Sequence, residues 1–160
     1  MRPDGSAITF YLDKKGGRHL LVLMQGSDCN SVVHSKVIND RFAAVIGDAD
    51  VLTVEKYALT RSVPWNGSGD SPGCPASYYE HDSPRQRADD YLQVMSWLDE
   101  QLEYDNIILL GGSEGALVAA MVASRSDKVS AVITLNGGGR FFVDDVFYSM
   151  SVDLPPEAFE

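Results

Sequence analysis

We predict an α/β fold for this chain, a doubly wound and mostly parallel sheet with an antiparallel N-terminal hairpin. Apolar strand-like runs alternate with segments of helical periodicity along most of the sequence, which is the pattern of strand–helix–strand units. The run at residues 19–24 is apolar from its second position onward, as expected of a strand that helices cover on both faces. A Gly-containing turn at residues 13–17 joins it to the preceding run and predicts a hairpin there.

The individual elements follow from apolar spacing and from the residues between them. Strands are expected at residues 7–12, 19–24, 51–56, 106–110 and 131–135, and helices at residues 33–46, 84–102 and 116–124. The second helix has the clearest start, because Ser83 can cap it, Pro84 suits its first turn and Gln86 completes a Ser-x-x-Gln capping box. Residues 59–82 form a loop rich in Gly, Pro and Ser, and loops of that length usually have a role of their own.

Length and composition indicate one ordinary globular domain. The chain has 160 residues, 44% apolar and 22% charged, which is enough to bury a single core. Thirteen basic residues against 23 acidic ones give a net charge of −10, which argues against nucleic acid or an anionic membrane surface as a partner. No run reaches the ~18 apolar residues of a membrane span. Residues 1–6 lack the apolar centre of a signal peptide.

The most informative motif is the Gly-Gly-Ser-Glu-Gly segment at residues 111–115. It follows the strand expected at residues 106–110 and precedes the helix expected at residues 116–124. A G-x-S-x-G turn in this position holds its serine in a strained conformation at the tip of a sheet, with the hydroxyl exposed above a helix N-terminus. Ser113 is therefore the candidate catalytic nucleophile.

A serine that transfers acyl groups also needs backbone N–H groups that point toward the oxyanion of the reaction. In a parallel sheet, such groups gather beyond the carboxyl ends of the strands. Glu114, the residue after the nucleophile, supplies one N–H at the start of its helix. We expect the second N–H from Ser27, in the loop after the second strand, where Gly26 would let the backbone approach a substrate closely.

The order of these parts resembles the central portion of an α/β-hydrolase. An apolar strand, a Gln-Gly-Ser loop, a helix, a strand, a long loop, a helix and then G-x-S-x-G follow one another over residues 7–136. The resemblance implies a partial α/β-hydrolase fold, with residues 1–140 as the N-terminal part of its core and residues 141–160 as the start of a lid or of a C-terminal extension. It also implies a serine esterase or related acyl hydrolase that attacks an ester, thioester or amide through an acyl-enzyme on Ser113.

One part of the family pattern is missing. In the family an acid and a histidine follow the nucleophile, but no histidine follows Ser113 in this sequence. His34 and His81 lie near the active edge and are more simply explained as solvated or structural residues. Asp144 and Asp145 follow the last strand, where some relatives carry the acid, and are more simply explained as a solvated face. Three explanations stay open: a missing C-terminal segment supplies acid and histidine, a second chain supplies them, or the protein is a non-catalytic relative.

We therefore expect a serine hydrolase for a small-molecule acyl substrate, with little or no turnover from these 160 residues alone. A serine without its base keeps only the catalysis that comes from its oxyanion hole and from binding. The alternative is a non-catalytic binding module built on the same sheet. No cofactor and no metal is implied, because His, Cys and carboxylate residues do not cluster at ligand spacing.

The two cysteines bear on the compartment. Cys29 and Cys74 lie in loops after strands that the resembled fold places side by side. They are expected either as a disulfide that joins the oxyanion loop to the long loop, or as two free thiols. We expect a soluble protein, cytoplasmic or periplasmic or secreted, and a bond between Cys29 and Cys74 would indicate one of the latter two.

Overall fold

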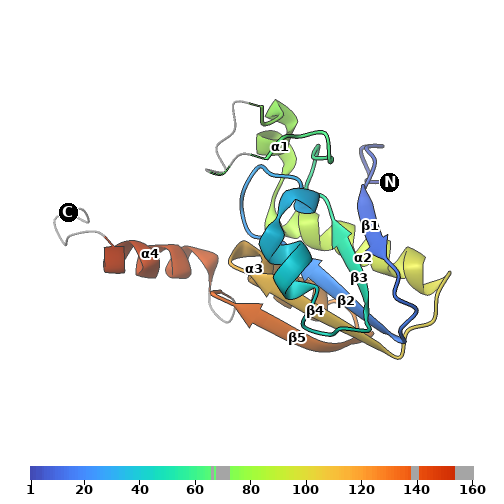
Figure 1. Cartoon of the computed structure of the whole chain (residues 1–160). Coiled ribbons are helices and arrows are strands. Elements are labelled where there is room, and N and C mark those ends of the chain that lie inside the picture. Colours follow the sequence, from blue (N-terminus) through green and yellow to red (C-terminus); the bar gives the residue numbers. More distant parts are fainter. Residues whose placement is uncertain (66, 68–72, 138–140, 154–160) are drawn as a thin grey trace.

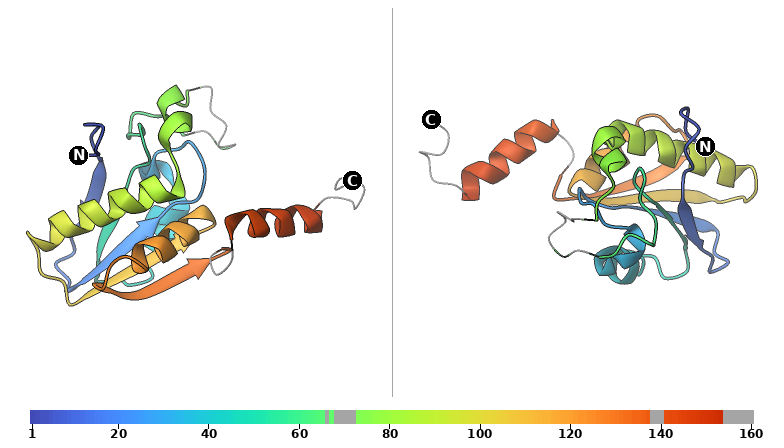
Figure 2. Two further views of the ribbon diagram at one scale, coloured as in Figure 1. Left: turned by 180° about the vertical axis from the view of Figure 1, so that it is seen from behind. Right: turned by 90° about the horizontal axis from the view of Figure 1, so that it is seen from above.

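The computed structural model describes residues 1–65, 67, 73–137 and 141–153 (Figure 1). Its elements in chain order are β1 (Phe10–Asp13), β2 (His19–Met24), η1 (Val32–His34), η2 (Val37–Phe42), β3 (Asp50–Val54), α1 (Ala76–His81), α2 (Pro84–Asp99), β4 (Asn106–Gly112), α3 (Glu114–Ala123), β5 (Val129–Leu135) and α4 (Phe142–Asp153). The α2 and α3 helices lie on one face of the sheet, and η1 and η2 lie on the other (Figure 2). This arrangement confirms the predicted α/β fold class.

The strand order is β1-β3-β2-β4-β5, with β1 antiparallel to β3 and all other pairs parallel. The first strand is therefore antiparallel as predicted, but its partner is β3 and not β2. The reason is that both sides of β2 already pair with parallel strands, β3 and β4, so β1 cannot pair with β2. The chain between β1 and β2 crosses the start of β3, where the backbone N–H groups of Lys15 and Gly16 donate to Asp50 Oδ1 at 2.7 and 2.9 Å.

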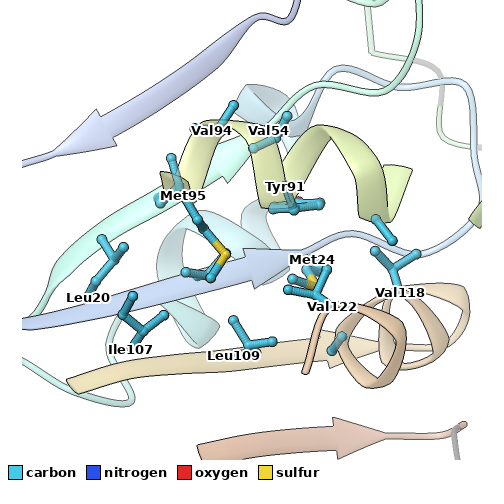
Figure 3. Close-up of a cluster of buried hydrophobic side chains, with 14 of the residues drawn as sticks. Leu20, Met24, Val54, Tyr91, Val94, Met95, Ile107, Leu109, Val118 and Val122 are labelled. Atoms are coloured by element: carbon cyan, nitrogen blue, oxygen red, sulfur yellow. The ribbon is translucent and has the colours of Figure 1, made fainter. Parts of the chain in front are cut away.

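The central strand β2 supplies side chains to both layers of the core. Leu20, Val22 and Met24 pack against α2 and α3 (Figure 3). Leu21 and Leu23 point the other way and pack against η1 and η2. All five are at most 1% exposed, and each buried side chain of this kind contributes about 1.5–3 kcal/mol to folding. The uninterrupted apolar sequence of β2 thus reflects burial on both faces.

The helices follow the sequence pattern where capping residues define them. Ser83 caps α2 and its Oγ accepts the N–H of Gln86 at 3.2 Å. The segment expected as one helix over residues 33–46 instead forms two short pieces, the 3-10 helix η1 and the π-helix η2. Asn39 Nδ2 donates to the carbonyls of Val32 and Ser35, both at 2.8 Å. Both carbonyls also accept backbone N–H groups, and the break falls at Ser35, whose backbone is extended with φ −77° and ψ 104°.

The C-terminal elements are the most exposed part of the described structure. β5 lies at one end of the sheet, and Val132 and Leu135 on it are 39% and 41% exposed. α4 extends away from the sheet (Figure 2). Phe147 and other apolar side chains on it are exposed to solvent. The division into a core over residues 1–140 and a lid or extension over residues 141–160 stays a prediction, and residues 138–140 and 154–160 lie outside the described residues. No helix among the described residues is both long and apolar enough to cross a membrane.

Candidate active site

Ser113 occupies a strained turn between β4 and α3. Its backbone has φ 54° and ψ −127°, a region that residues other than glycine rarely adopt. Such a conformation costs on the order of 1–3 kcal/mol and is kept only where the surroundings fix it. Here the Ser113 N–H donates to the Leu135 carbonyl at 2.9 Å, and the Ser113 carbonyl accepts the N–H of Ala116 at 2.9 Å. The residue is exposed, so its hydroxyl lies at the surface of the sheet edge.

The two outer glycines of the turn are required by close packing. A Cβ on Gly111 would lie 2.1 Å from the carbonyl oxygen of Gly115. A Cβ on Gly115 would lie 2.1 Å from the carbonyl oxygen of Met24 and 2.8 Å from that of Gln25. The first turn of α3 therefore rests directly on the end of β2, which brings Ser113 next to the loop that follows β2.

Ser113 lines a cleft of about 410 Å³ at the carboxyl end of the sheet. Gly26 also lines the cleft directly beside Ser113, since an added Cβ there would lie 3.4 Å from Ser113 Cβ and 3.8 Å from Ser113 Oγ. Asp28 and Asn136 add polar groups to the lining. The apolar wall comes from η2 and the end of β5, through Val37, Ile38, Phe42 and Leu135. The cleft thus offers a serine hydroxyl beside an apolar surface.

The loop after β2 is held by buried charges. Asp28 Oδ1 accepts hydrogen bonds from Gln25 Nε2 at 2.7 Å and from the Asn30 N–H at 3.1 Å. Lys56 is only 2% exposed, and its Nζ donates to the Asp28 carboxylate at 2.9 Å and to the Asp28 carbonyl at 2.5 Å. Burial lowers the pKa of this lysine, and the neighbouring Arg87 adds to the effect. The loop conformation is therefore fixed at Asp28.

Further contacts fix the same loop from the other side. The buried Glu55 accepts the Ser31 hydroxyl at 2.5 Å and the Val32 N–H at 3.1 Å. The Tyr78 hydroxyl donates to the Asp28 carbonyl at 3.0 Å. Cys29 and Cys74 form a disulfide with their Cα atoms 5.9 Å apart, which is the first of the two expected states. A disulfide is compatible with an oxidising compartment.

Arg87 links the loop to the helix that follows Ser113. It lies on α2 and is 3% exposed. Its Nη1 is 2.5 Å from Glu114 Oε1, and its Nη2 donates to the Gln25 carbonyl. The sequence pattern does not single out Arg87 or Lys56, because charged side chains are normally exposed. Arg87 lies four residues before Tyr91 and seven before Val94, both buried, and this helical spacing is a signal that it faces inward.

The structure thus brings together Ser113, Gly26 and the first residue of α3, Glu114. Ser27 is exposed beside Gly26 and does not line the cleft, so its N–H as an oxyanion donor stays a prediction. A second hollow of about 480 Å³ lies between residues 2–4 and the start of α2 and contains none of the predicted site residues. We therefore place the candidate site at Ser113.

None of the three histidines lines the cleft formed by the described residues. His19 Nδ1 is 3.2 Å from Asn106 Nδ2 at the far end of β2, and His34 Nε2 is 3.1 Å from the Arg61 carbonyl. His81 stacks against Tyr57 with ring centroids 4.6 Å apart.

Asp144, an acidic residue after β5 that the structure describes, does not line the cleft either. Asp144 is exposed on α4, and the side chain of Asp145 lies outside the described part of the structure. Within the described ranges no group of three His, Cys, Asp or Glu side chains is arranged to hold a metal ion.

Comparisons with known proteins agree with the fold. A family described as having the alpha/beta hydrolase fold matches residues 62–158, more than half of the chain. A lipase-esterase related protein from Clostridium acetobutylicum is similar in structure, with a TM-score of 0.58 and 18% identity over 90% of this chain and 55% of that one. An α/β serine hydrolase without a lid from Xanthomonas campestris gives a TM-score of 0.57 and 18% identity over 86% of this chain and 60% of that one. The chain thus spans between half and two thirds of these relatives. No curated protein matches it in sequence.

Proposed function

The chain belongs to the α/β-hydrolase fold family, and from this premise we propose that it is a serine hydrolase that acts through an acyl-enzyme on Ser113. Membership in this family supports a hydrolase-type function. The observation that carries the finer proposal is the conformation of Ser113, which is exposed at positive φ between β4 and α3 and lies beside Gly26 in the cleft. A strained, exposed serine in this setting is the arrangement expected of a nucleophile elbow.

The proposed reaction begins with attack of Ser113 Oγ on the carbonyl carbon of an ester, thioester or amide. The N–H groups of Ser27 and Glu114 would stabilise the resulting oxyanion, and the N-terminus of α3 favours the negative charge. Collapse of the intermediate releases the alcohol, thiol or amine and leaves an acyl-enzyme, which water then hydrolyses. The apolar wall that includes Phe42 would contact an apolar part of the substrate.

The proton of Ser113 requires a base, and no histidine among the described residues lines the cleft. We propose that acid and histidine come from a further segment or from a second chain, and that the described chain alone turns over slowly or not at all. Without its base, a serine of this type retains roughly 10³–10⁴-fold catalysis over water from the oxyanion hole and from binding.

Added imidazole tests this proposal, because it can replace a missing histidine as a diffusible base. We expect a fluorophosphonate probe to label the chain at one site, Ser113, and imidazole to accelerate the labelling. Ser113→Ala should abolish labelling. Ser124→Ala, which removes an exposed serine at the end of α3, should leave it unchanged.

A folded chain that remains unlabelled at Ser113 with and without imidazole would contradict the proposal. That result would favour the second candidate function, a non-catalytic binding module. The observation in favour of this alternative is that no histidine lines the cleft in the described part of the chain. Binding of an acyl compound at the cleft without chemical turnover would then be the expected behaviour.

A further inference from the structure

Arg87 contacts both segments that flank the proposed oxyanion hole, one through the Glu114 side chain and the other through the Gln25 backbone. On one side it pairs with Glu114, the residue directly after Ser113, at 2.5 Å. On the other side its Nη2 donates to the Gln25 carbonyl, two residues before Ser27. The guanidinium is planar and presents its donors in a fixed fork, so the two bonds hold their acceptors in a defined relative position.

The segment between these anchor points is short. Gly26 and Ser27 lie between Gln25, whose carbonyl is bound by Arg87, and Asp28, whose carbonyl is bound by Lys56. Two buried cations therefore fix the backbone immediately before and after the Gly26-Ser27 pair. The close approach of Gly115 to the Met24 carbonyl brings the start of α3 directly against this segment.

From this placement we infer that Arg87 is a positioning residue, which holds the N–H groups of Ser27 and Glu114 at a common point. The inference rests on the proposed function. A buried ion pair by itself is weak support for stability. Arg87 differs from an ordinary buried ion pair because it joins the loop after β2 to the start of α3. These two segments are far apart in sequence and lie side by side at the proposed site. Small misplacements at such a site have large effects, because a shift of about 1 Å can cost roughly 10²-fold in rate.

A thiol in place of Ser113 gives a readout that does not depend on the missing base. The two native cysteines are bonded to each other, so the Ser113→Cys variant carries a single free thiol. Its thiolate can be acylated by p-nitrophenyl acetate, where an S–C bond forms and p-nitrophenolate leaves through a tetrahedral oxyanion. It can also be alkylated by iodoacetamide, where iodide leaves and no oxyanion forms. The ratio of the two rates cancels the thiolate fraction and reports stabilisation of the oxyanion.

We expect the acylation-to-alkylation ratio of Ser113→Cys to exceed that of free N-acetylcysteine. Adding Arg87→Met should lower the ratio roughly 10- to 100-fold. Adding Arg87→Lys should also lower it, because a lysine can keep the pair with Glu114 but cannot donate to both acceptors in the same geometry. Arg87→Lys retains the buried charge, so if Arg87→Met does not fold, the ratio measured for Arg87→Lys tests the inference.

The matched control is Arg2→Met in the Ser113→Cys background. Arg2 pairs with Asp90, which lies on the same helix as Arg87, and both side chains are 5% exposed. The side-chain hydrogen bonds of Arg2 go to Asp90, Ser6 and Ala7, and not to the loop after β2. Its loss should lower stability and leave the ratio unchanged. An elevated ratio that Arg87→Met and Arg87→Lys both leave intact would overturn the inference. A ratio for Ser113→Cys no higher than that of N-acetylcysteine would instead overturn the proposed function.

Discussion

Replacing Gly115 by alanine tests the close packing that positions Ser113. In a helix, an alanine normally stabilises a protein relative to glycine by roughly 0.5–1 kcal/mol. At Gly115 the sign should reverse, because the new Cβ would lie 2.1 Å from the Met24 carbonyl oxygen, about 1.3 Å inside the 3.4 Å of ordinary contact. Overpacking of this kind typically costs about 1–3 kcal/mol. For a chain of this size we therefore expect the melting temperature to fall by roughly 2–12 °C.

The assay is thermal and urea unfolding followed by far-UV circular dichroism. Gly47→Ala is the matched control, since nothing lies within 4 Å of a Cβ at that position. It should be neutral or raise stability slightly through the entropy of the unfolded chain. If Gly115→Ala proved as stable as Gly47→Ala, the contact between α3 and the end of β2 would not be as close as described. The reasoning on the position of Ser113 would fail with it.

Two further predictions concern stability. Replacing Cys29 and Cys74 together by serine opens a loop of 45 residues and should lower the free energy of unfolding by about 4 kcal/mol, measured by urea denaturation; a loss below about 1 kcal/mol would contradict this. Burial raises the pKa of Asp82, against the effect of the nearby Arg87 and Lys56. Its folded-state pKa exceeds the unfolded value of 3.8, so its contribution to stability is present below that value and is lost as pH rises through the folded pKa. Asp82→Asn should therefore gain stability relative to the parent as pH rises above 3.8, and a pH-independent difference in urea midpoints would refute this.

Much of the fold could be predicted because its determinants are local. The apolar run of β2 and the capping residues of α2 are short sequence features, and the structure confirms both. The turn around Ser113 is also local, since Gly111 and Gly115 each lie only two positions from Ser113 in the sequence. Its steric requirement for glycine becomes visible only once β2 lies beneath it.

The features that could not be predicted depend on distant parts of the chain. The partner of β1 is β3, and the pairing is decided by which strands already fill the edges of β2. The break between η1 and η2 lies at the extended backbone of Ser35, which the spacing of apolar residues does not reveal. Arg87 and its partners lie 27 and 62 positions apart in sequence, so no spacing rule connects them. Whether Cys29 and Cys74 form a disulfide could not be predicted for the same reason, because the two residues are 45 positions apart in sequence.

The place of β5 at the end of the sheet has a consequence for handling the protein. In the described part of the chain one flank of this strand has no neighbouring strand, so its amide hydrogens and carbonyl oxygens face outward. Such a flank is a template onto which an extended peptide, including the same strand of another molecule, can add. Association through this strand would increase with protein concentration. Measurements at several dilutions therefore separate the reactivity of single molecules from the effects of aggregation.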